Sequence, residues 1–156
     1  MVEQPSIDLV RSSLKGGIIG VSFLSRNTKE QVETMTKYFP DITKRISNDL
    51  KRLRKDIPDT LQGFSALANA ASRAGALDKK TKELIALALG VAAHCDGCIG
   101  FHVETLVRLG ATRQEIEEAL GMAVYMGGGP SLMYAADAIA AFEQYDELAH
   151  AEAAMD

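Results

Sequence analysis

The sequence predicts an all-α protein with one domain. Apolar residues recur at helical intervals, alanine is abundant from Ala66 onward, and only four prolines interrupt the 156 residues. No segment shows the alternation of apolar and polar residues that is typical of a β-strand. Alanine favours helices, and a chain of this length usually folds as one domain. We expect about six to eight helices from the periodicity and the cap signals.

The first 60 residues divide into two parts. In residues 1–26, the short stretch Gly16–Leu24 is apolar but contains three glycines, and we expect an arm or extension that packs on the domain or on a neighbouring subunit. Residues 27–60 are expected to be a helical N-terminal region, in which an N-cap signal at Asn27 opens a helix that ends near Pro40. The next helix is predicted by apolar residues at intervals of three and four: Ile42, Ile46, Leu50, Leu53 and Ile57.

Residues 61–145 are expected to form the helical core, and residues 146–156 a tail that frays. The apolar run Ile85–Ala93 predicts a helix that is buried on most sides. The boundaries of the helices are predicted by these cap and break signals: Pro58, Gly75, Asp78, Gly110, the capping box Thr112–Glu115 and the loop Gly127–Pro130. Three methionines are expected to fill the core: Met122, Met126 and Met133.

Composition excludes several classes of partner. The net charge of −4 argues against nucleic acid, because phosphate binding requires a concentrated basic surface. No apolar stretch approaches the roughly 20 residues that a membrane-spanning helix needs. The N-terminus lacks the basic start and the cleavage site of a secretory signal. We therefore expect a cytoplasmic protein that binds neither nucleic acid nor membrane, and we expect no cofactor.

Both cysteines of the chain, Cys95 and Cys98, lie three residues apart. In a reducing compartment, a close pair indicates redox exchange or metal binding. A predicted helix, Asp96–Leu109, places them at its N-terminus, where free N–H groups and the helix dipole favour a thiolate. His102 follows Cys98 by four residues and therefore shares its helix face. A thiolate is the nucleophile both in thiol–disulfide exchange and in attack on a peroxide.

Glu83 is expected to meet His102. Glu83 lies ten residues before Ala93, which is roughly 15 Å from the end of the preceding helix. His102 lies seven residues after Cys95, which is roughly 10 Å into the next helix, the antiparallel partner. Packed helices are about 8–10 Å apart, so the side chains meet directly or through one water. The hypothesis is a proton relay in which Glu83 supports His102, and His102 takes the proton of Cys98. The dipole favours Cys95 as the attacking thiol, but contact with the imidazole favours Cys98, with Cys95 as the resolving thiol.

These residues resemble the carboxymuconolactone decarboxylase superfamily and, within it, the alkyl hydroperoxidase D (AhpD)-like branch. The resemblance covers about half the chain, roughly residues 61–142, and rests on these segments: Leu77-Asp78, Lys82-Glu83-Leu84, His94-Cys95-Asp96-Gly97-Cys98, His102, Gly110-Ala111-Thr112, Glu115-Ile116, Gly128-Gly129-Pro130 and Tyr134-Ala135. It implies an all-helical fold that assembles as a homo-oligomer, commonly a trimer or hexamer. It also implies that Cys98 is the peroxidatic cysteine and Cys95 the resolving one. The chain departs from the best-studied hydroperoxidase members at Gly97, where they carry a histidine.

The reaction expected first is the reduction of an organic hydroperoxide or of a partner's disulfide, with electrons from a thiol donor. Three alternatives remain open: a lyase like the decarboxylase that names the superfamily, a non-enzymatic metal-binding or interaction module, and a pair of inert buried thiols. In the metal-binding alternative, the two cysteines and His102 ligate zinc, with Glu83 or His94 as the fourth ligand. His94 is either a supporting residue of the site or a cap at the end of the preceding helix.

Overall fold

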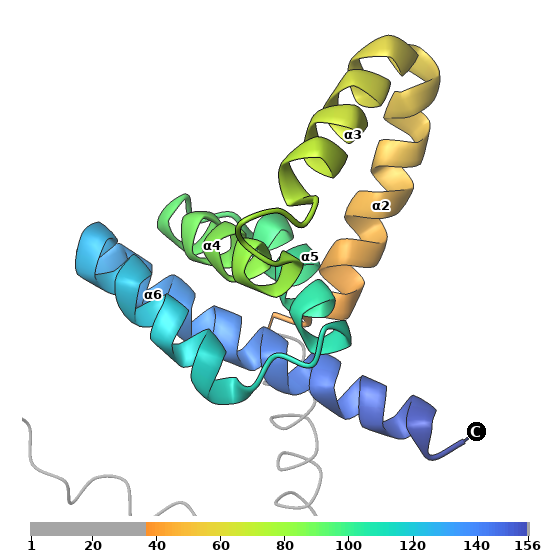
Figure 1. The fold of residues 1–156 in the computed structure, drawn as a ribbon. Helices are drawn as coiled ribbons and strands as arrows, with labels where there is room; N and C mark the ends of the chain where they lie inside the picture. Colours follow the sequence, from red (N-terminus) through yellow and green to blue (C-terminus); the bar gives the residue numbers. More distant parts are fainter. Residues whose placement is uncertain (1–36, 156) are drawn as a thin grey trace, which may run out of the picture. The chain divides into compact units, whose positions relative to one another are not determined.

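The computed structural model describes residues 37–155, which form five helices (Figure 1). In chain order these are α2 (Phe39–Asp56), α3 (Pro58–Ser72), α4 (Lys79–Ala92), α5 (Asp96–Arg108) and α6 (Arg113–Ala153). No strand occurs within residues 37–155, and the predicted all-α class is confirmed. The predictions for residues 1–26 and for the helix that starts at Asn27 lie outside the described residues.

The long helix α6 consists of two antiparallel halves that join at Gly128. The φ of Gly128 is 69° and its ψ is −156°, which no helix contains. Arg113 and Glu143 are 30 residues apart, yet Nη1 of the arginine lies 2.6 Å from Oε1 of the glutamate. A straight helix would separate these residues by about 45 Å. The predicted turn at Gly127–Pro130 is therefore present, and Figure 1 shows the chain turning back between the cyan and blue parts of α6.

Helices α4, α5 and α6 form the body of the described part. Their buried aliphatic residues make one core, to which α2 adds Phe39; the largest members are Leu87, Val91, Ile99, Val103, Leu106 and Ile116. The expectation that α4 is buried on most sides is wrong. Leu87 and Val91 face the core, but Ile85 and Leu89 are exposed, because α5 and α6 cover only one side of α4.

The three methionines expected in the core are exposed, so that prediction is also wrong. They lie beside the turn of α6: Met122, Met126 and Met133. Tyr125 and Leu132 are exposed in the same part of α6, so the turn carries an apolar surface. A tight turn has few neighbours on its outer side, and the small residues Ala123 and Ala135 are the ones that face the core.

Several predicted helix ends are confirmed by hydrogen bonds. Asp78 caps α4 by accepting a bond of 2.7 Å from the N–H of Thr81. Thr112 and Glu115 form the predicted capping box at the start of α6. Gly110 ends α5 in the left-handed region, with a φ of 68°. The expected tail does not fray at its beginning: α6 continues to Ala153 because its last turns contain no glycine or proline.

Helices α2 and α3 extend together from the body (Figure 1). The start of α2 is anchored, since Phe39 and Thr43 are buried and the Thr43 hydroxyl lies 2.8 Å from that of Tyr145. The anchoring ends there, because α3 has no buried residue in the described part of the chain. None of the described helices combines the length and the apolar character that crossing a membrane requires.

Candidate active site

The connection between α4 and α5 places the first cysteine through a tight turn. His94 adopts a φ of 54°, a left-handed conformation that glycine usually takes at the end of a helix. Its N–H donates to the carbonyl of Val91 at 3.1 Å, and the N–H of Cys95 donates to the carbonyl of Gly90 at 3.0 Å. This pair of bonds is the Schellman motif, which fixes the direction in which the chain leaves α4. The backbone at Cys95 is therefore held in place before α5 begins.

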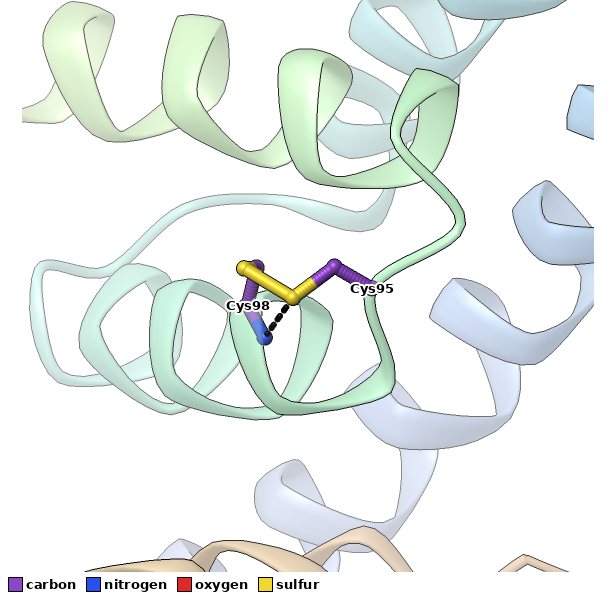
Figure 2. The surroundings of a disulfide bond; sticks show 2 residues. All are labelled: Cys95 and Cys98. Carbon is purple, nitrogen blue, oxygen red and sulfur yellow. Dashed lines mark hydrogen bonds between the residues drawn. A yellow bond between two sulfur atoms is a disulfide. The ribbon is translucent and has the colours of Figure 1, made fainter. Parts of the chain in front are cut away.

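Cys95 and Cys98 form a disulfide at the N-terminus of α5 (Figure 2). Cys95 is the N-cap residue, and its Sγ accepts a hydrogen bond of 3.2 Å from the backbone N–H of Cys98. In the reduced protein, the same N–H and the helix dipole would stabilise negative charge on that sulfur. Both cysteines are half-buried, so the pair is neither sealed in the core nor fully exposed.

Glu83 and His102 make the direct contact that their spacing predicts. The distance from Nδ1 of His102 to Oε2 of Glu83 is 2.7 Å, and it joins α5 to α4. Glu83 is only 8% exposed, and a buried carboxylate is costly without such a partner. Since a carboxylate accepts, Nδ1 carries the hydrogen and donates it. When the imidazole is neutral, this hydrogen bond leaves the lone pair on Nε2, and His102 lies one turn of helix beyond Cys98.

A groove borders this pair on the side away from the core. Its volume is about 530 Å³, and Glu83 and His102 belong to the polar part of its lining, with Asn69, Ser72 and Lys82. Most of the remaining lining is apolar and comes from α3 and α4, including Phe64, Ile85 and Leu89. The exposed side of α4, which sequence analysis placed in the core, is therefore one wall of the groove.

A second cluster flanks the cysteines and was not predicted. Nζ of Lys37 lies 2.8 Å from Oδ1 of Asp96 and 2.8 Å from Oδ2 of Asp137. The same ammonium group lies 4.9 Å from the ring centre of Tyr134, and the ring of His94 stacks on Tyr134 at 4.7 Å. Tyr134 and Asp137 are three residues apart on α6, and from this spacing the sequence could have predicted that they share a helix face.

The structure assigns His94 to the turn before the cysteines. Its backbone ends α4 in the left-handed turn, as a cap does, while its ring packs on Tyr134. Neither feature brings it to the Glu83–His102 pair. Within residues 37–155, no three His, Cys, Asp or Glu side chains converge as a metal ion would require.

Gly97, at which the chain departs from the best-studied hydroperoxidases, lies against α2. A Cβ atom at this position would be 2.9 Å from Cδ1 of Ile46. A side chain at residue 97 would therefore require Ile46 to move. The packing of α2 on the start of α5 explains why a small residue occupies this position.

The fold and the site together define an all-helical protein with a Cys-x-x-Cys pair at a helix start, and comparison with known proteins gives its family. Residues 58–141 match the carboxymuconolactone decarboxylase family, to which the chain therefore belongs. An uncharacterized protein from Cupriavidus necator is 42% identical over 86 residues, which are 55% of this chain and 76% of that protein.

Solved structures are also similar to this chain. The apo form of a carboxymuconolactone decarboxylase family protein from Legionella pneumophila is 64% identical, with a TM-score of 0.68 over 69% of this chain and 96% of that one. A family member from Thermotoga maritima, whose suggested role is in an antioxidative response, is 35% identical. Its TM-score is 0.55 over 58% of this chain and 94% of that one.

Proposed function

We propose that this protein is a thiol-dependent oxidoreductase that cycles Cys95 and Cys98 between dithiol and disulfide. The observation that carries the proposal is the disulfide at the start of α5, one turn before a histidine that a buried glutamate holds. Its substrate would be an organic hydroperoxide or the disulfide of a partner. A thiol donor would return the electrons, as expected in a reducing compartment such as the cytoplasm.

With a hydroperoxide, the dithiol supplies both electrons. Nε2 of His102 accepts the proton of the Cys98 thiol, and Glu83 keeps the ring in the orientation that leaves Nε2 free. The Cys98 thiolate attacks the terminal peroxide oxygen, so that an S–O bond forms and the O–O bond breaks. The alkoxide leaves as an alcohol after taking the proton from His102, and Cys98 becomes a sulfenic acid.

Cys95 then closes the cycle. Its sulfur attacks the sulfenic sulfur of Cys98, the S–S bond forms, and hydroxide leaves and is protonated to water. Their Cα atoms are 5.3 Å apart in the disulfide form, a separation within the usual range for disulfides. Two equivalents of a thiol donor then reduce the disulfide by exchange through a mixed disulfide.

The groove favours a substrate with an apolar part. Its walls offer Phe64, Ile85 and Leu89, whereas Glu83 and His102 supply polar groups at one place. An organic hydroperoxide can bury its hydrocarbon part against such walls, and hydrogen peroxide cannot. We therefore expect a higher kcat/KM for cumene hydroperoxide than for hydrogen peroxide.

The function is tested by a thiol count before and after peroxide, followed by mass spectrometry across residues 95–98. We expect two thiols to become one intramolecular disulfide that a dithiol reductant reverses. Cys98→Ser should abolish turnover, whereas Cys95→Ser should stop at a sulfenic acid on Cys98. A sulfenic acid that accumulates on Cys95 instead would reverse the two roles, and thiols that remain unreactive would overturn the proposal.

His102→Gln and Glu83→Gln test the relay. Each should lower kcat/KM by about 10²–10⁴-fold, the usual contribution of general acid–base catalysis. His150→Gln is the matched control, because His150 also lies near a carboxylate, that of Asp146 at 3.5 Å, but is exposed near the end of α6. Equal activity of His102→Gln and His150→Gln would exclude the relay.

We also propose that the chain assembles as a homo-oligomer, as the family resemblance implies. The apolar side chains that α3 leaves exposed support this, since Phe64 is 67% and Leu67 is 66% exposed. Light scattering should give a mass at least twice that of one chain, which is 16.8 kDa. Phe64→Glu should lower that mass without loss of helicity. A monomeric wild type would contradict the proposal, and an unchanged mass for Phe64→Glu would exclude this face.

A further inference from the structure

Lys37 contacts Asp96, one of the two residues between the cysteines. Asp96 follows Cys95 directly, and its carboxylate accepts a hydrogen bond from Nζ of Lys37. The second carboxylate on Lys37 belongs to Asp137 of α6. The Lys37 side chain is 38% exposed, so this is a partly shielded arrangement in which charges interact more strongly than in water.

The two carboxylates keep Lys37 charged. Partial burial works against the ammonium form, but the hydrogen bonds to Asp137 and Asp96 outweigh it and raise the pKa of Lys37 above its ordinary value. The amine therefore stays protonated over the whole range in which a cysteine thiol titrates. A permanent positive charge thus accompanies the negative charge of Asp96 at the start of α5.

The surroundings hold Lys37 where this charge matters. Its ammonium group lies near the ring of Tyr134, which also stacks on His94, the residue that forms the turn before Cys95. On the other side, Gln144 of α6 donates a hydrogen bond of 2.9 Å to the Lys37 carbonyl. Backbone and side chain are therefore both fixed relative to the cysteine turn.

We propose that Lys37 is a positioning residue that sets the reduction potential of the Cys95–Cys98 couple by cancelling the charge of Asp96. This inference rests on the proposed thiol–disulfide function. It names no new reactant, because the equilibrium is the same exchange with a thiol donor: the disulfide takes up two electrons and one proton to give one thiol and one thiolate.

The direction of the effect follows from charge. The disulfide is neutral, whereas the reduced pair carries a thiolate that a nearby carboxylate destabilises. Without Lys37, the charges of Asp96 and Asp137 are both uncompensated and the reduced form is less stable. Lys37→Met should therefore make the disulfide harder to reduce and move its potential to more negative values.

The experiment equilibrates the full chain with mixtures of reduced and oxidised glutathione and counts the free thiols. For Lys37→Met, we expect the equilibrium constant for reduction to fall about tenfold, which for this two-electron couple is about 30 mV. Lys37→Arg, which keeps the charge, should remain near the wild type. The difference in reduction potential between Lys37→Met and the wild type should become smaller at acidic pH, where the reduced pair carries no thiolate.

Variants of Asp96 separate charge from structure. Asp96→Asn removes the negative charge while Lys37 keeps its bond to Asp137, so the potential should move to less negative values. The double variant Lys37→Met/Asp96→Asn removes both charges and should return towards the wild type. A bridge that only attaches α2 would stabilise oxidised and reduced protein alike, and neither shift would occur.

Lys80→Met is the matched control. Lys80 pairs with Glu115 at 2.6 Å and is about as exposed as Lys37, but it lies at the opposite end of α4. The reduction potential of the Lys80→Met variant should equal that of the wild type. If the wild-type thiols do not exchange with glutathione at all, the proposed function fails. If they exchange but Lys37→Met and Asp96→Asn leave the potential unchanged, the function stands and this inference is wrong.

Discussion

The body of the described part and the helix α3 are built from similar residues but differ in packing. Both carry leucine, alanine and a few larger apolar side chains. In the body, each of the helices α4, α5 and α6 buries several residues, and Leu87, Ile99 and Ile116 have no exposed surface. In α3, no residue is buried within the described part. Apolar composition therefore does not decide which helix belongs to the core.

The difference bears on the proposed function, because the residues of the candidate site belong to the well-packed region. Glu83, His102 and the cysteines lie on α4 and α5, which contact each other and α6. Helix α3 supplies only one wall of the groove beside them. Catalysis requires side chains that are held in position to within about 0.5 Å, and close packing provides this. The apolar wall of a groove does not require the same precision.

The largest expected contrast is between two leucines. Leu87→Ala should lower the free energy of unfolding by about 2–5 kcal/mol, because it leaves a cavity in the core. Leu67→Ala on α3 should change it by less than about 0.5 kcal/mol in the monomer. Urea unfolding followed by circular dichroism measures both. Equal losses of unfolding free energy for the two variants would contradict the difference in packing between the body and α3.

A dependence on concentration would sharpen this contrast. If a second copy covers α3, the loss for Leu67→Ala should grow as protein concentration rises, because assembly stabilises only the folded state. Leu87→Ala should show the same loss at every concentration. The pair of leucines therefore separates burial within the chain from burial between copies.

The next contrast uses two helical glycines. A Cβ atom on Gly100 of α5 would lie 2.5 Å from Cγ2 of Thr43, so Gly100→Ala should cost about 1–3 kcal/mol. Gly63 of α3 has no atom within 4 Å of such a Cβ, and Gly63→Ala should stabilise by about 0.5–1 kcal/mol. The urea midpoints of the two variants show whether each substitution stabilises or destabilises the protein.

A double variant identifies the cause. Thr43→Ser removes Cγ2 but keeps the hydroxyl that contacts Tyr145. Combined with Gly100→Ala, it should recover part of the lost stability. If no part is recovered, the close approach of α2 to α5 is not the reason that residue 100 is a glycine.

Local rules explain what the sequence could predict. The capping box at Thr112, the cap at Asp78 and the left-handed Gly110 depend on three or four neighbouring residues, and all three are present. The contact of Glu83 with His102 could also be predicted, because it requires only the rise of a helix and one antiparallel neighbour. Such geometry is independent of the rest of the chain.

The features that were missed depend on the path of the whole chain. The second half of α4, Ile85–Ala92, is apolar all round, so its sequence could not reveal that Leu89 would be exposed and face a groove. Lys37 meets Asp96 across 59 residues and Asp137 across 100. No periodicity relates positions that far apart, and a lysine gives no sign that it has two partners. The left-handed His94 was missed because that position usually holds glycine.

The smallest expected contrast lies at the helix starts. In the body, Asp78 caps α4 and Glu115 belongs to the cap of α6, whereas the N-caps of α2 and α3 make no side-chain hydrogen bond. The N–H of Thr81 lowers the pKa of Asp78, and the hydrogen bond from Lys80 lowers the pKa of Glu115. Both carboxylates are thus more acidic in the folded protein than in the unfolded chain.

A lowered pKa has a definite effect on stability. The contribution is complete above the pKa of the unfolded state, about 4 for these side chains, and is lost as the pH falls through the lower folded value. The urea midpoint should therefore decrease below about pH 4. Asp78→Asn should reduce that decrease without much change at pH 7, because asparagine caps a helix as well as aspartate but does not titrate. If Asp78→Asn and the wild type lose stability in parallel on acidification, the charge of the cap contributes nothing. The difference between the two regions would then rest on burial alone.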